Sequence, residues 1–286
     1  MSADSVAAVK REILVRHLET WAPGALRRGR RATYVHGYAD ADPTLTTAAL
    51  EVFADESYLA RGRELTVIAL GEPPEVKGLS VLTVAGDPEA TAGVALKAAG
   101  ASRVPLLGVW NAAPGPGALA ALATGKPAEI VAVLPAGTAA PELRATLHEA
   151  GFPLVAEVEL AVSDEPGEIL VYGTTLGKHL EAFKDLLWAV DEYAGVRYRD
   201  PGDPERHLID ISLSPHPGPL RRELLARLVE VGSATVTELR TYALTDTVYR
   251  ASDATRVLHA LLDAGAVTRR PADGRLGGDV VISPGA

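Results

Sequence analysis

The chain contains no cysteine, one methionine and few aromatic residues, which make up 5% of its 286 residues. The absence of cysteine excludes disulfides and thiolate metal sites, and it fits a cytoplasmic protein. The sequence also lacks an apolar run long enough to span a membrane. Its start, at Met1 to Asp4, leads into a charged segment without the apolar core of a signal peptide. We therefore expect a cytoplasmic protein with no membrane partner.

Several catalytic motifs are missing as well. The seven histidines show no metal-ligand spacing, so no metal site is expected. Residues 125–127 and 177–179 contain Gly-Lys but lack the rest of a P-loop, and no Gly-x-Ser-x-Gly nucleophile elbow occurs. His17 falls on the apolar face of the first helical pattern, which favours a core histidine.

Acidic residues outnumber basic ones, and the excess is unevenly distributed. The net charge is −9, but from Pro219 to the end nine Arg stand against eight Asp and Glu. The rest of the chain holds 19 basic and 29 acidic residues, a balance of −10. Attraction of nucleic-acid phosphates is therefore not expected of the first part, and it stays open for the tail.

Short apolar runs alternate with helical patterns over the first 150 residues. An amphipathic helix is predicted at about 4–22, ending before Pro23 and Gly24. Strands are predicted at 32–35, 64–70, 79–84, 104–110 and 129–134, and helices at 44–60, 88–100 and 139–150. This alternation predicts an α/β fold with a doubly wound parallel sheet.

The pattern changes after residue 150. Two strands at 154–162 and 168–172 are separated by a five-residue turn, which predicts an antiparallel hairpin. A helix at 180–193 and one more strand at 207–213 follow. Five β/α units closed by such a hairpin are the arrangement of class I S-adenosylmethionine-dependent methyltransferases, a Rossmann-like fold.

A linker at 216–219 precedes a different pattern. Three helical stretches, at 220–231, 236–242 and 249–264, are followed by 267–270, a turn at 273–274 and a strand at 279–283. Three helices and a two-stranded ribbon in this order predict a winged helix-turn-helix. We therefore expect two domains, a methyltransferase-like α/β domain at 1–215 and a winged helix at 219–286.

The loop after the first strand is the predicted cofactor site. A strand that leads into a helix N-terminus is where open α/β folds bind anions and nucleotides. Close approach of such a ligand to the backbone requires several glycines, and only Gly37 is present. Asp42 is a preferred N-cap that would occupy the free N–H groups, and Asp40 would repel an anion. These residues indicate a nucleotide-type site that has been altered or lost.

Other candidate residues follow the neighbouring strands. Glu72 and Asp87 come after the second and third strands, where such folds contact ribose and adenine; a turn carboxylate or helix cap is the alternative for each. Asn111, after the fourth strand, is the candidate catalytic residue, because its side chain could hydrogen-bond a substrate amine. His36 directly follows a buried strand, and we expect a packed or hydrogen-bonded histidine.

The chain resembles the three-Cys-motif partner protein family over nearly its whole length. Residues 10–21 are similar to its opening helix, and 34–39 to its first strand. Residues 172–174, with Lys184 and Trp188, resemble its segment after the hairpin, and 244–247 its winged-helix signature. The resemblance implies a methyltransferase-like domain with a C-terminal winged helix, S-adenosylmethionine as cofactor, and a protein with a three-cysteine motif as partner.

The chain departs from the family at functional positions. His36 stands where the family has Asp, and residues 40–42 read Asp-Ala-Asp where it has Gly-Pro-Gly. We therefore expect a pseudoenzyme whose S-adenosylmethionine site, around Gly37, Asp40, Glu72 and Asp87, is weak or inactive. Its function would be that of an accessory or binding subunit to the three-cysteine-motif protein.

Two alternatives stay open. The first is an active S-adenosylmethionine-dependent methyltransferase that acts on nucleic acid. The second is a winged-helix DNA-binding regulator whose large domain dimerises or senses a ligand. In either case the residues expected to face nucleic acid are Arg240, Arg250, Arg256, Arg269 and Arg270. Protein contact is an equal alternative for this surface, and a partner is expected to dock on exposed apolar residues at 118–124 and near Trp188.

Overall fold

The computed structural model describes residues 2–54, 62–138, 140–190, 195–203, 205–209 and 217–285. The chain divides into two compact units, Met1–Ile209 and Asp210–Ala286, where the sequence predicts domains at 1–215 and 219–286. Parts of the helices predicted at 44–60 and 180–193, of the strand at 207–213, and of the linker lie outside the described residues.

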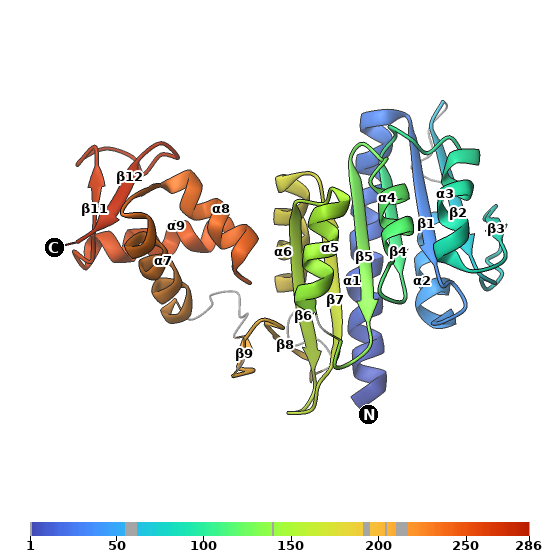
Figure 1. The fold of residues 1–286 in the computed structure, drawn as a ribbon, viewed down its shortest axis with the longest axis horizontal. Coiled ribbons are helices and arrows are strands. Elements are labelled where there is room, and N and C mark those ends of the chain that lie inside the picture. Colours follow the sequence, from blue (N-terminus) through green and yellow to red (C-terminus); the bar gives the residue numbers. More distant parts are fainter. Residues whose placement is uncertain are drawn as a thin grey trace. The chain divides into compact units, whose positions relative to one another are not determined.

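The larger unit is built on a nine-stranded sheet in the order β3-β2-β1-β4-β5-β7-β6-β8-β9 (Figure 1). The parallel strands are β1 (Arg31–Gly37), β2 (Glu64–Leu70), β3 (Leu82–Val84), β4 (Leu106–Trp110) and β5 (Ala128–Leu134). The antiparallel strands are β7 (Glu168–Thr174), β6 (Leu154–Ala161), β8 (Arg197–Arg199) and β9 (Leu208–Ile209). The predicted α/β fold of Rossmann-like type is confirmed.

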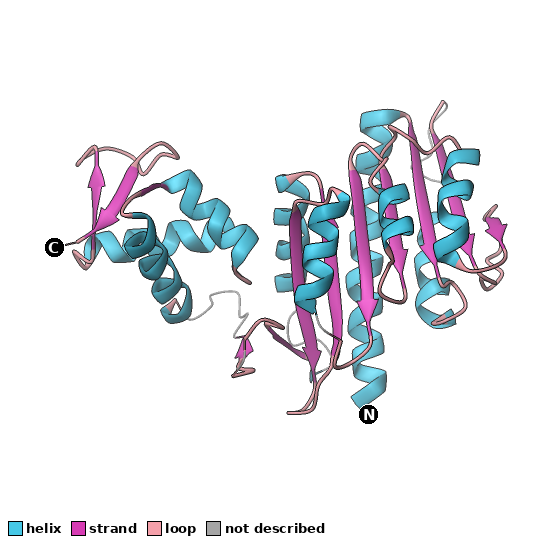
Figure 2. Ribbon diagram, viewed as in Figure 1, coloured by secondary structure: helices cyan, strands magenta, loops and turns pink. Residues whose placement is uncertain are grey.

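Helices cover both faces of this sheet (Figure 2). On one face α1 (Ser2–Gly29) packs against α2 (Pro43–Ala54) and α6 (Gly177–Ala189). On the other, α4 (Pro116–Leu122) packs between α3 (Pro88–Ala98) and α5 (Ala140–Ala150). Because side chains alternate along a strand, Ile130 and Val171 enter the core under α3 to α5, whereas Glu129 and Tyr172 face α1 and α6.

Helix α1 is longer than predicted, because it continues through Pro23 to Gly29. A proline inside a helix costs about 3 kcal/mol, since it removes one backbone donor and its ring crowds the preceding turn. The turn beyond it buries Ala25 and Leu26, which are 5% and 0% exposed. Burial of these side chains offsets the cost, and the predicted end of the helix before Pro23 is wrong.

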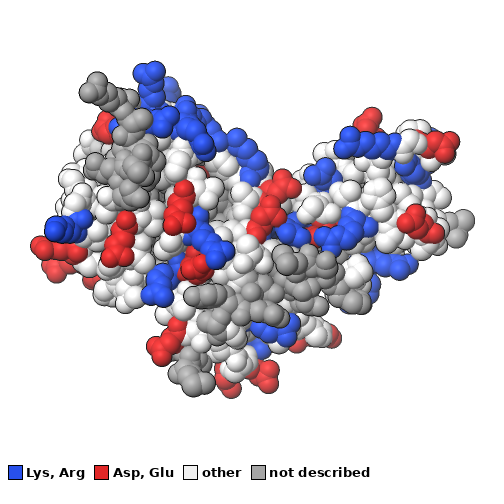
Figure 3. All heavy atoms as spheres, turned by 180° about the vertical axis from the view of Figure 1, so that it is seen from behind, with Lys and Arg blue, Asp and Glu red and all other residues white. Residues whose placement is uncertain are grey.

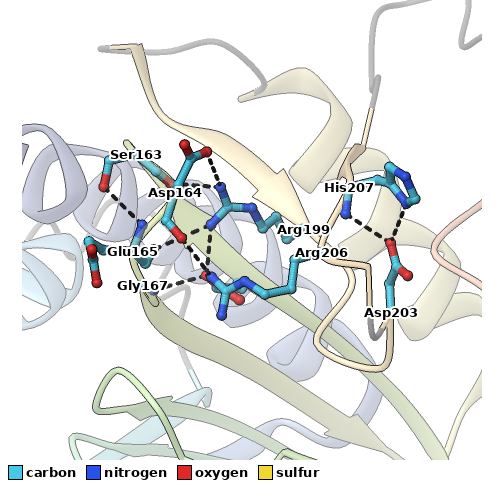
Figure 4. A network of polar contacts seen from close by, with 9 residues as sticks. Ser163, Asp164, Glu165, Gly167, Arg199, Asp203, Arg206 and His207 are labelled. Atoms are coloured by element: carbon cyan, nitrogen blue, oxygen red, sulfur yellow. Dashed lines mark hydrogen bonds and ion pairs between the residues drawn. The ribbon is translucent and has the colours of Figure 1, made fainter.

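The β6–β7 hairpin is held to β8 by a buried ionic network (Figure 4). The Arg199 guanidinium donates to the carbonyls of Ser163 and Glu165, at 2.7 and 3.3 Å. It also pairs with Glu159 Oε1 at 3.2 Å, and Arg206 reaches the same oxygen at 2.9 Å. This network explains how β8 forms a strand although its sequence, Arg-Tyr-Arg, has no apolar run.

The described part of the smaller unit contains three helices and a three-stranded antiparallel sheet. The helices are α7 (Gly218–Val231), α8 (Val236–Asp246) and α9 (Ala251–Asp263), and the strands are β10 (Ala234–Thr235), β11 (Val267–Arg270) and β12 (Val281–Pro284), in the order β10-β12-β11. Leu224, Leu239 and Leu258 from the three helices meet in its core and are 0 to 1% exposed. The unit therefore has a core of its own.

The predicted docking patches are not exposed. Leu119 and Leu122 in α4 are fully buried, and Trp188 in α6 is 4% exposed, because both helices press their apolar faces onto the sheet. The expectation that residues 118–124 and Trp188 present an apolar surface is therefore wrong. Within the part of the chain that the structure describes, no helix is long and apolar enough to cross a membrane.

Candidate functional site

The loop from β1 to α2, the predicted cofactor corner, is closed at the helix end. Asp42 caps α2: the Leu45 N–H donates to its carboxylate at 3.0 Å, and the Thr46 N–H donates to its carbonyl at 2.9 Å. Lys10 of α1, 8% exposed, lies 3.5 Å from the Asp42 carboxylate and 2.8 Å from Glu168. The predicted N-cap is confirmed, and these contacts occupy N–H groups that an anionic ligand would need.

The backbone of the same corner is covered by side chains of the chain itself. A Cβ atom on Gly37 would collide with the Trp110 indole, which therefore lies directly on this glycine. The Trp110 Nε1–H donates to Glu89 at 3.3 Å, which fixes the ring. Asp40 lies over Gly71, whose φ is +108°, so that a Cβ there would be 2.5 Å from the Asp40 carboxylate. The missing side chain at Gly37 thus leaves room for the Trp110 ring, and Asp40 covers the end of β2.

His36 is fully buried behind this loop and is held from both ring nitrogens. Its Nδ1 lies 2.7 Å from the Tyr34 hydroxyl, and its Nε2 lies 3.1 Å from Asn111 Nδ2 and 3.3 Å from Thr46 Oγ1. Burial lowers the pKa of His36 to about 4, although the Asp42 charge acts in the opposite direction. The side chain is neutral at pH 7, and the predicted packed histidine is confirmed.

Asn111, the candidate catalytic residue, directs its amide nitrogen inward. Besides His36, this nitrogen contacts the Tyr38 carbonyl at 3.3 Å, and a carbonyl can only accept. His36 Nε2 is therefore an acceptor, and its Nδ1 carries the proton toward Tyr34. The Asn111 Oδ1 atom is buried and has no hydrogen-bond partner among the described residues. Only this acceptor is left for a ligand.

The two remaining cofactor candidates lie in exposed turns. Asp87 caps α3, because the Glu89 N–H donates to its carboxylate at 3.1 Å, and the helix-cap alternative is confirmed for this residue. Glu72 follows β2 and is exposed. The structure thus brings His36 and Asn111 together, whereas Asp42 and Asp87 each cap a helix.

A cavity of about 440 Å³ lies at the other edge of the sheet, between α1 and α6. The strands β1 to β5 end at the predicted corner, whereas the cavity includes Pro127 and Glu129, at the beginning of β5. Its lining consists of Arg16, His17, Glu19, Thr20, Trp21, Gly24, Ala25, Arg27, Arg28, Pro127, Glu129, His179, Ala182 and Leu186.

The floor of the cavity is a buried carboxylate with its partners. Glu129, 1% exposed, accepts a short hydrogen bond from the Tyr172 hydroxyl and lies 2.9 Å from His179 Nδ1. The Arg28 guanidinium lies 3.3 Å from His179 Nε2, on the side of the ring away from Glu129. Burial raises the pKa of Glu129, but the contacts with His179, His17 and Tyr172 outweigh it and hold the pKa below its ordinary value.

One wall of the cavity carries two buried nitrogen atoms without partners. Trp21 is 6% exposed and His17 9% exposed, and neither Trp21 Nε1 nor His17 Nε2 has a hydrogen-bond partner among the described residues. His17 Nε2 is 4.0 Å from Glu129, and burial lowers the pKa of His17. Edge-on contacts with Tyr172 and Phe183, at 5.4 and 5.3 Å between ring centroids, fix its ring.

Of the five arginines predicted to face nucleic acid, three make contacts within the smaller unit. Arg250 and Arg256 both bind the carboxylate of Asp253, at 3.0 Å. Arg269 donates to the carbonyls of residues 271, 273, 274 and 275 and so holds the β11–β12 turn. Arg240 and Arg270 are exposed. These two are the arginines best placed for an external phosphate.

The comparisons with known proteins include a distant structural similarity. No family model matches the chain, and no curated protein matches it. The crystal structure of EvdMO1 is similar at 14% sequence identity with a TM-score of 0.36, and the match covers 57% of this chain and 41% of that one. The matched region is thus less than half of EvdMO1, and we infer neither fold nor function from a TM-score of 0.36.

Sequence reasoning missed the cavity and its residues. His17, Glu129, Tyr172 and His179 come from α1, β5, β7 and α6, so no spacing along the chain connects them. One local signal was available, because Glu129 stands within the otherwise apolar run of β5. Among the described residues, no group of three or more His, Asp or Glu side chains is arranged to hold a metal ion.

Proposed function

We propose that the chain is a methyltransferase-fold protein of the three-Cys-motif partner family that acts as an accessory or binding subunit. In this proposal its S-adenosylmethionine site is weak or inactive, and its partner is a protein with a three-cysteine motif. The partner assignment depends on the sequence resemblance alone.

The strand order supports the methyltransferase-fold part of the proposal. Class I methyltransferases have the arrangement predicted from the sequence, in which five β/α units are closed by an antiparallel hairpin. In this chain the order β3-β2-β1-β4-β5-β7-β6, with β7 antiparallel to its neighbours, agrees with that arrangement. The strands β8 and β9 extend the sheet beyond it.

The observation that carries the loss of cofactor binding is the closed corner. Open α/β folds bind nucleotides outside the carboxyl ends of their strands, where backbone N–H groups must be accessible. Here Asp42 and Lys10 occupy the α2 end, Trp110 lies on Gly37, and Asp40 lies over Gly71. A ligand would have to displace these side chains before it reached the backbone.

The proposal also includes the assignment of the smaller unit as a winged helix-turn-helix. Its elements follow the order helix, short strand, helix, helix and two-stranded hairpin, which is that of a winged helix-turn-helix. In such modules a helix and the hairpin turn contact the ligand. Arg240 in α8 and Arg270 in β11 are exposed on these elements, which keeps nucleic-acid binding as the second function to test.

Calorimetric titration with S-adenosylmethionine and S-adenosylhomocysteine tests the proposal. We expect no saturable binding of either compound at micromolar concentrations. Micromolar binding of both would contradict it and would favour the active methyltransferase.

The variant Asp40→Gly, Asp42→Gly tests the charge argument directly. Removing both carboxylates should improve S-adenosylmethionine binding, by a few kcal/mol at most, because like-charge repulsion disappears and N–H groups become free. The loss of the Asp42 cap should cost about 1 kcal/mol of stability. The single variant Asp40→Gly is the matched control that keeps the cap. Unchanged binding in the double variant would mean that Trp110, and not charge, closes the corner.

A further inference from the structure

We propose that the cavity between α1 and α6 binds a small organic anion, a carboxylate or a phosphate monoester with an apolar body. This site lies at the edge of the sheet opposite the predicted cofactor corner, so the proposal is independent of whether that corner binds S-adenosylmethionine.

The unpartnered nitrogens on the α1 wall indicate that the ligand brings hydrogen-bond acceptors. An indole N–H can only donate, and leaving a buried donor unsatisfied costs about 1 to 3 kcal/mol. Trp21 Nε1 is such a donor, and the Trp21 residue lines a cavity of about 440 Å³, a volume typical of small-molecule sites. His17 Nε2 lies on the same wall and also lacks a partner among the described residues. An oxygen of the ligand would satisfy the Trp21 donor.

Charged side chains of both signs line the cavity. The Arg28 guanidinium lies 3.3 Å from His179 Nε2, and among the described residues no ion pair joins Arg27 to a carboxylate. Arg16 is neutralised by Glu12, which leaves Glu19 as the acidic group at the rim. The floor carboxylate, Glu129, is already held by Tyr172 and His179. The guanidinium groups of Arg27 and Arg28 thus stand against Glu19 at the rim and the buried charge of Glu129 beneath the floor, so the attraction for an anion comes from the surrounding edge.

The surrounding edge is basic although the unit as a whole is acidic. Strands β1 to β5 all begin at this edge, and Figure 3 shows Lys and Arg side chains along the upper rim of the larger unit. Arg31 is paired with Glu64 at the start of β2. The other exposed basic residues that precede or begin these strands, or lie in the first turn of α6, are Arg27, Arg28, Arg30, Arg103, Lys126 and Lys178. Such a field raises the local concentration of anions at the cavity.

The apolar part of the lining indicates that the ligand also has an apolar portion. Trp21, Ala25, Pro127, Ala182 and Leu186 contribute apolar surface to the cavity. An inorganic ion would leave this surface in contact with water, whereas a ring or short chain would cover it. The chemistry that fits is an acidic group near Arg28 attached to a small apolar body.

The test follows the Trp21 indole N–H by NMR during titration of the full chain. Only three tryptophans are present, and a Trp21→Phe variant identifies the signal. The probes are phenyl phosphate and benzoate, and benzyl alcohol is the neutral comparator of similar size. We expect either anion, or both, to shift the signal saturably, and Arg28→Gln to weaken binding at least tenfold. Arg103→Gln, on the same edge but outside the cavity, should change it less than twofold.

The responses to the three probes show which kind of anion binds, and they can also overturn the proposal. A response to phenyl phosphate alone assigns a phosphate ester, and a response to benzoate alone assigns a carboxylate; both support the site. No response to either probe overturns it, as does an equal response to benzyl alcohol. Equal weakening by Arg28→Gln and Arg103→Gln would also overturn it, because attraction would then belong to the whole edge. Thermal unfolding of each variant verifies that the fold is intact.

Discussion

His36 and Glu129 are both buried on the α1 side of the sheet, and their surroundings leave them in different charge states. Burial lowers the pKa of His36 to about 4, so the imidazole behind the predicted corner is neutral at pH 7. Burial works against ionisation of Glu129, yet contacts with His179, His17 and Tyr172 lower its pKa. The larger unit thus keeps a buried negative charge beneath the cavity and a neutral ring behind the corner.

Replacing His36 with Gln should reduce the loss of stability in acid. The imidazole titrates near pH 4 when folded and near 6.5 when unfolded, so between these values the unfolded chain binds more protons. Stability should therefore fall by about 1.4 kcal/mol per pH unit as the pH drops from 6.5 toward 4, with no contribution above 6.5. Urea unfolding at several pH values, followed by tryptophan fluorescence, measures the slope, since all three tryptophans lie in the larger unit.

The control for this prediction is His259→Gln, at an exposed position of the smaller unit. It should leave the slope of the parent chain unchanged. A residual slope of the same sign is expected in His36→Gln, because burial also lowers the pKa of His17. An identical slope in the parent and His36→Gln would show that His36 does not remain neutral in the folded chain.

Among the helices and strands, the sequence predicted those features that depend only on residues close together in the chain. Strand β2 was predicted with its observed bounds because Glu64–Leu70 is an apolar run between turns. Asp42 was predicted as a cap, and for Asp87 a cap was the alternative to cofactor binding, because capping needs only a neighbouring backbone N–H. Strand β8 was not predicted, since the Arg199 network with the β6–β7 hairpin holds it in place.

The cavity could not be predicted for two physical reasons. Tertiary burial of Leu26 carries α1 past Pro23, and the added turn brings Ala25 and Arg28 to the cavity. The floor joins residues from separate elements, such as Glu129 and His179, that only the sheet order brings together. A sequence pattern with no tertiary information ends this helix at Pro23; its prediction of a buried His17 is confirmed, but it does not show that a cavity lies beside this residue.

Helix α9 provides a test of stability in the smaller unit, at Asp253. This carboxylate is 2% exposed and accepts from the Arg250 N–H at 3.1 Å and from two guanidinium groups at 3.0 Å. Asp253→Ala would leave these donors without an acceptor and should cost roughly 2 to 4 kcal/mol. Amide hydrogen exchange of α9 in the full chain measures the loss.

Asp263→Ala, at an exposed position of the same helix, is the matched control and should stay within about 0.5 kcal/mol of the parent. If both alanine variants exchange at the same rate, the Asp253 pairs do not stabilise the helix. Asp253→Asn should fall between the two, because the amide oxygen still accepts one hydrogen bond.

At the scale of the whole molecule, the two units differ in charge and each has its own core. We expect a fragment of residues 216–286 to fold alone, because each helix of the smaller unit contributes a buried leucine, Leu224, Leu239 or Leu258, to a separate compact unit. If the fragment binds DNA, affinity should fall steeply with salt. The variant Arg240→Gln, Arg270→Gln should reduce the magnitude of the logarithmic salt slope by about 2.

Arg269→Gln is not a suitable test of DNA contact, since Arg269 holds the β11–β12 turn through backbone carbonyls. Circular dichroism of the fragment shows whether it folds, and fluorescence anisotropy with labelled duplex DNA gives the salt slope. Binding that does not depend on salt, or no binding at low salt, would contradict a phosphate-contacting surface and would favour protein contact.

The last prediction concerns the isolated chain and its partner. The predicted cofactor corner is covered by Trp110, Asp40 and Asp42, and in the proposed accessory role the isolated chain would carry out no methyl transfer. If the resemblance to the three-Cys-motif partner family holds, the reactive step lies on the partner. We expect pull-down from the native cell to recover a metal- or cluster-binding protein, and the purified chain to transfer no tritium from labelled S-adenosylmethionine to DNA, RNA or protein. The Asp40→Gly, Asp42→Gly variant, assayed in parallel, shows whether opening the corner restores transfer. Tritium transfer by the parent chain alone would refute the accessory role and favour the active methyltransferase.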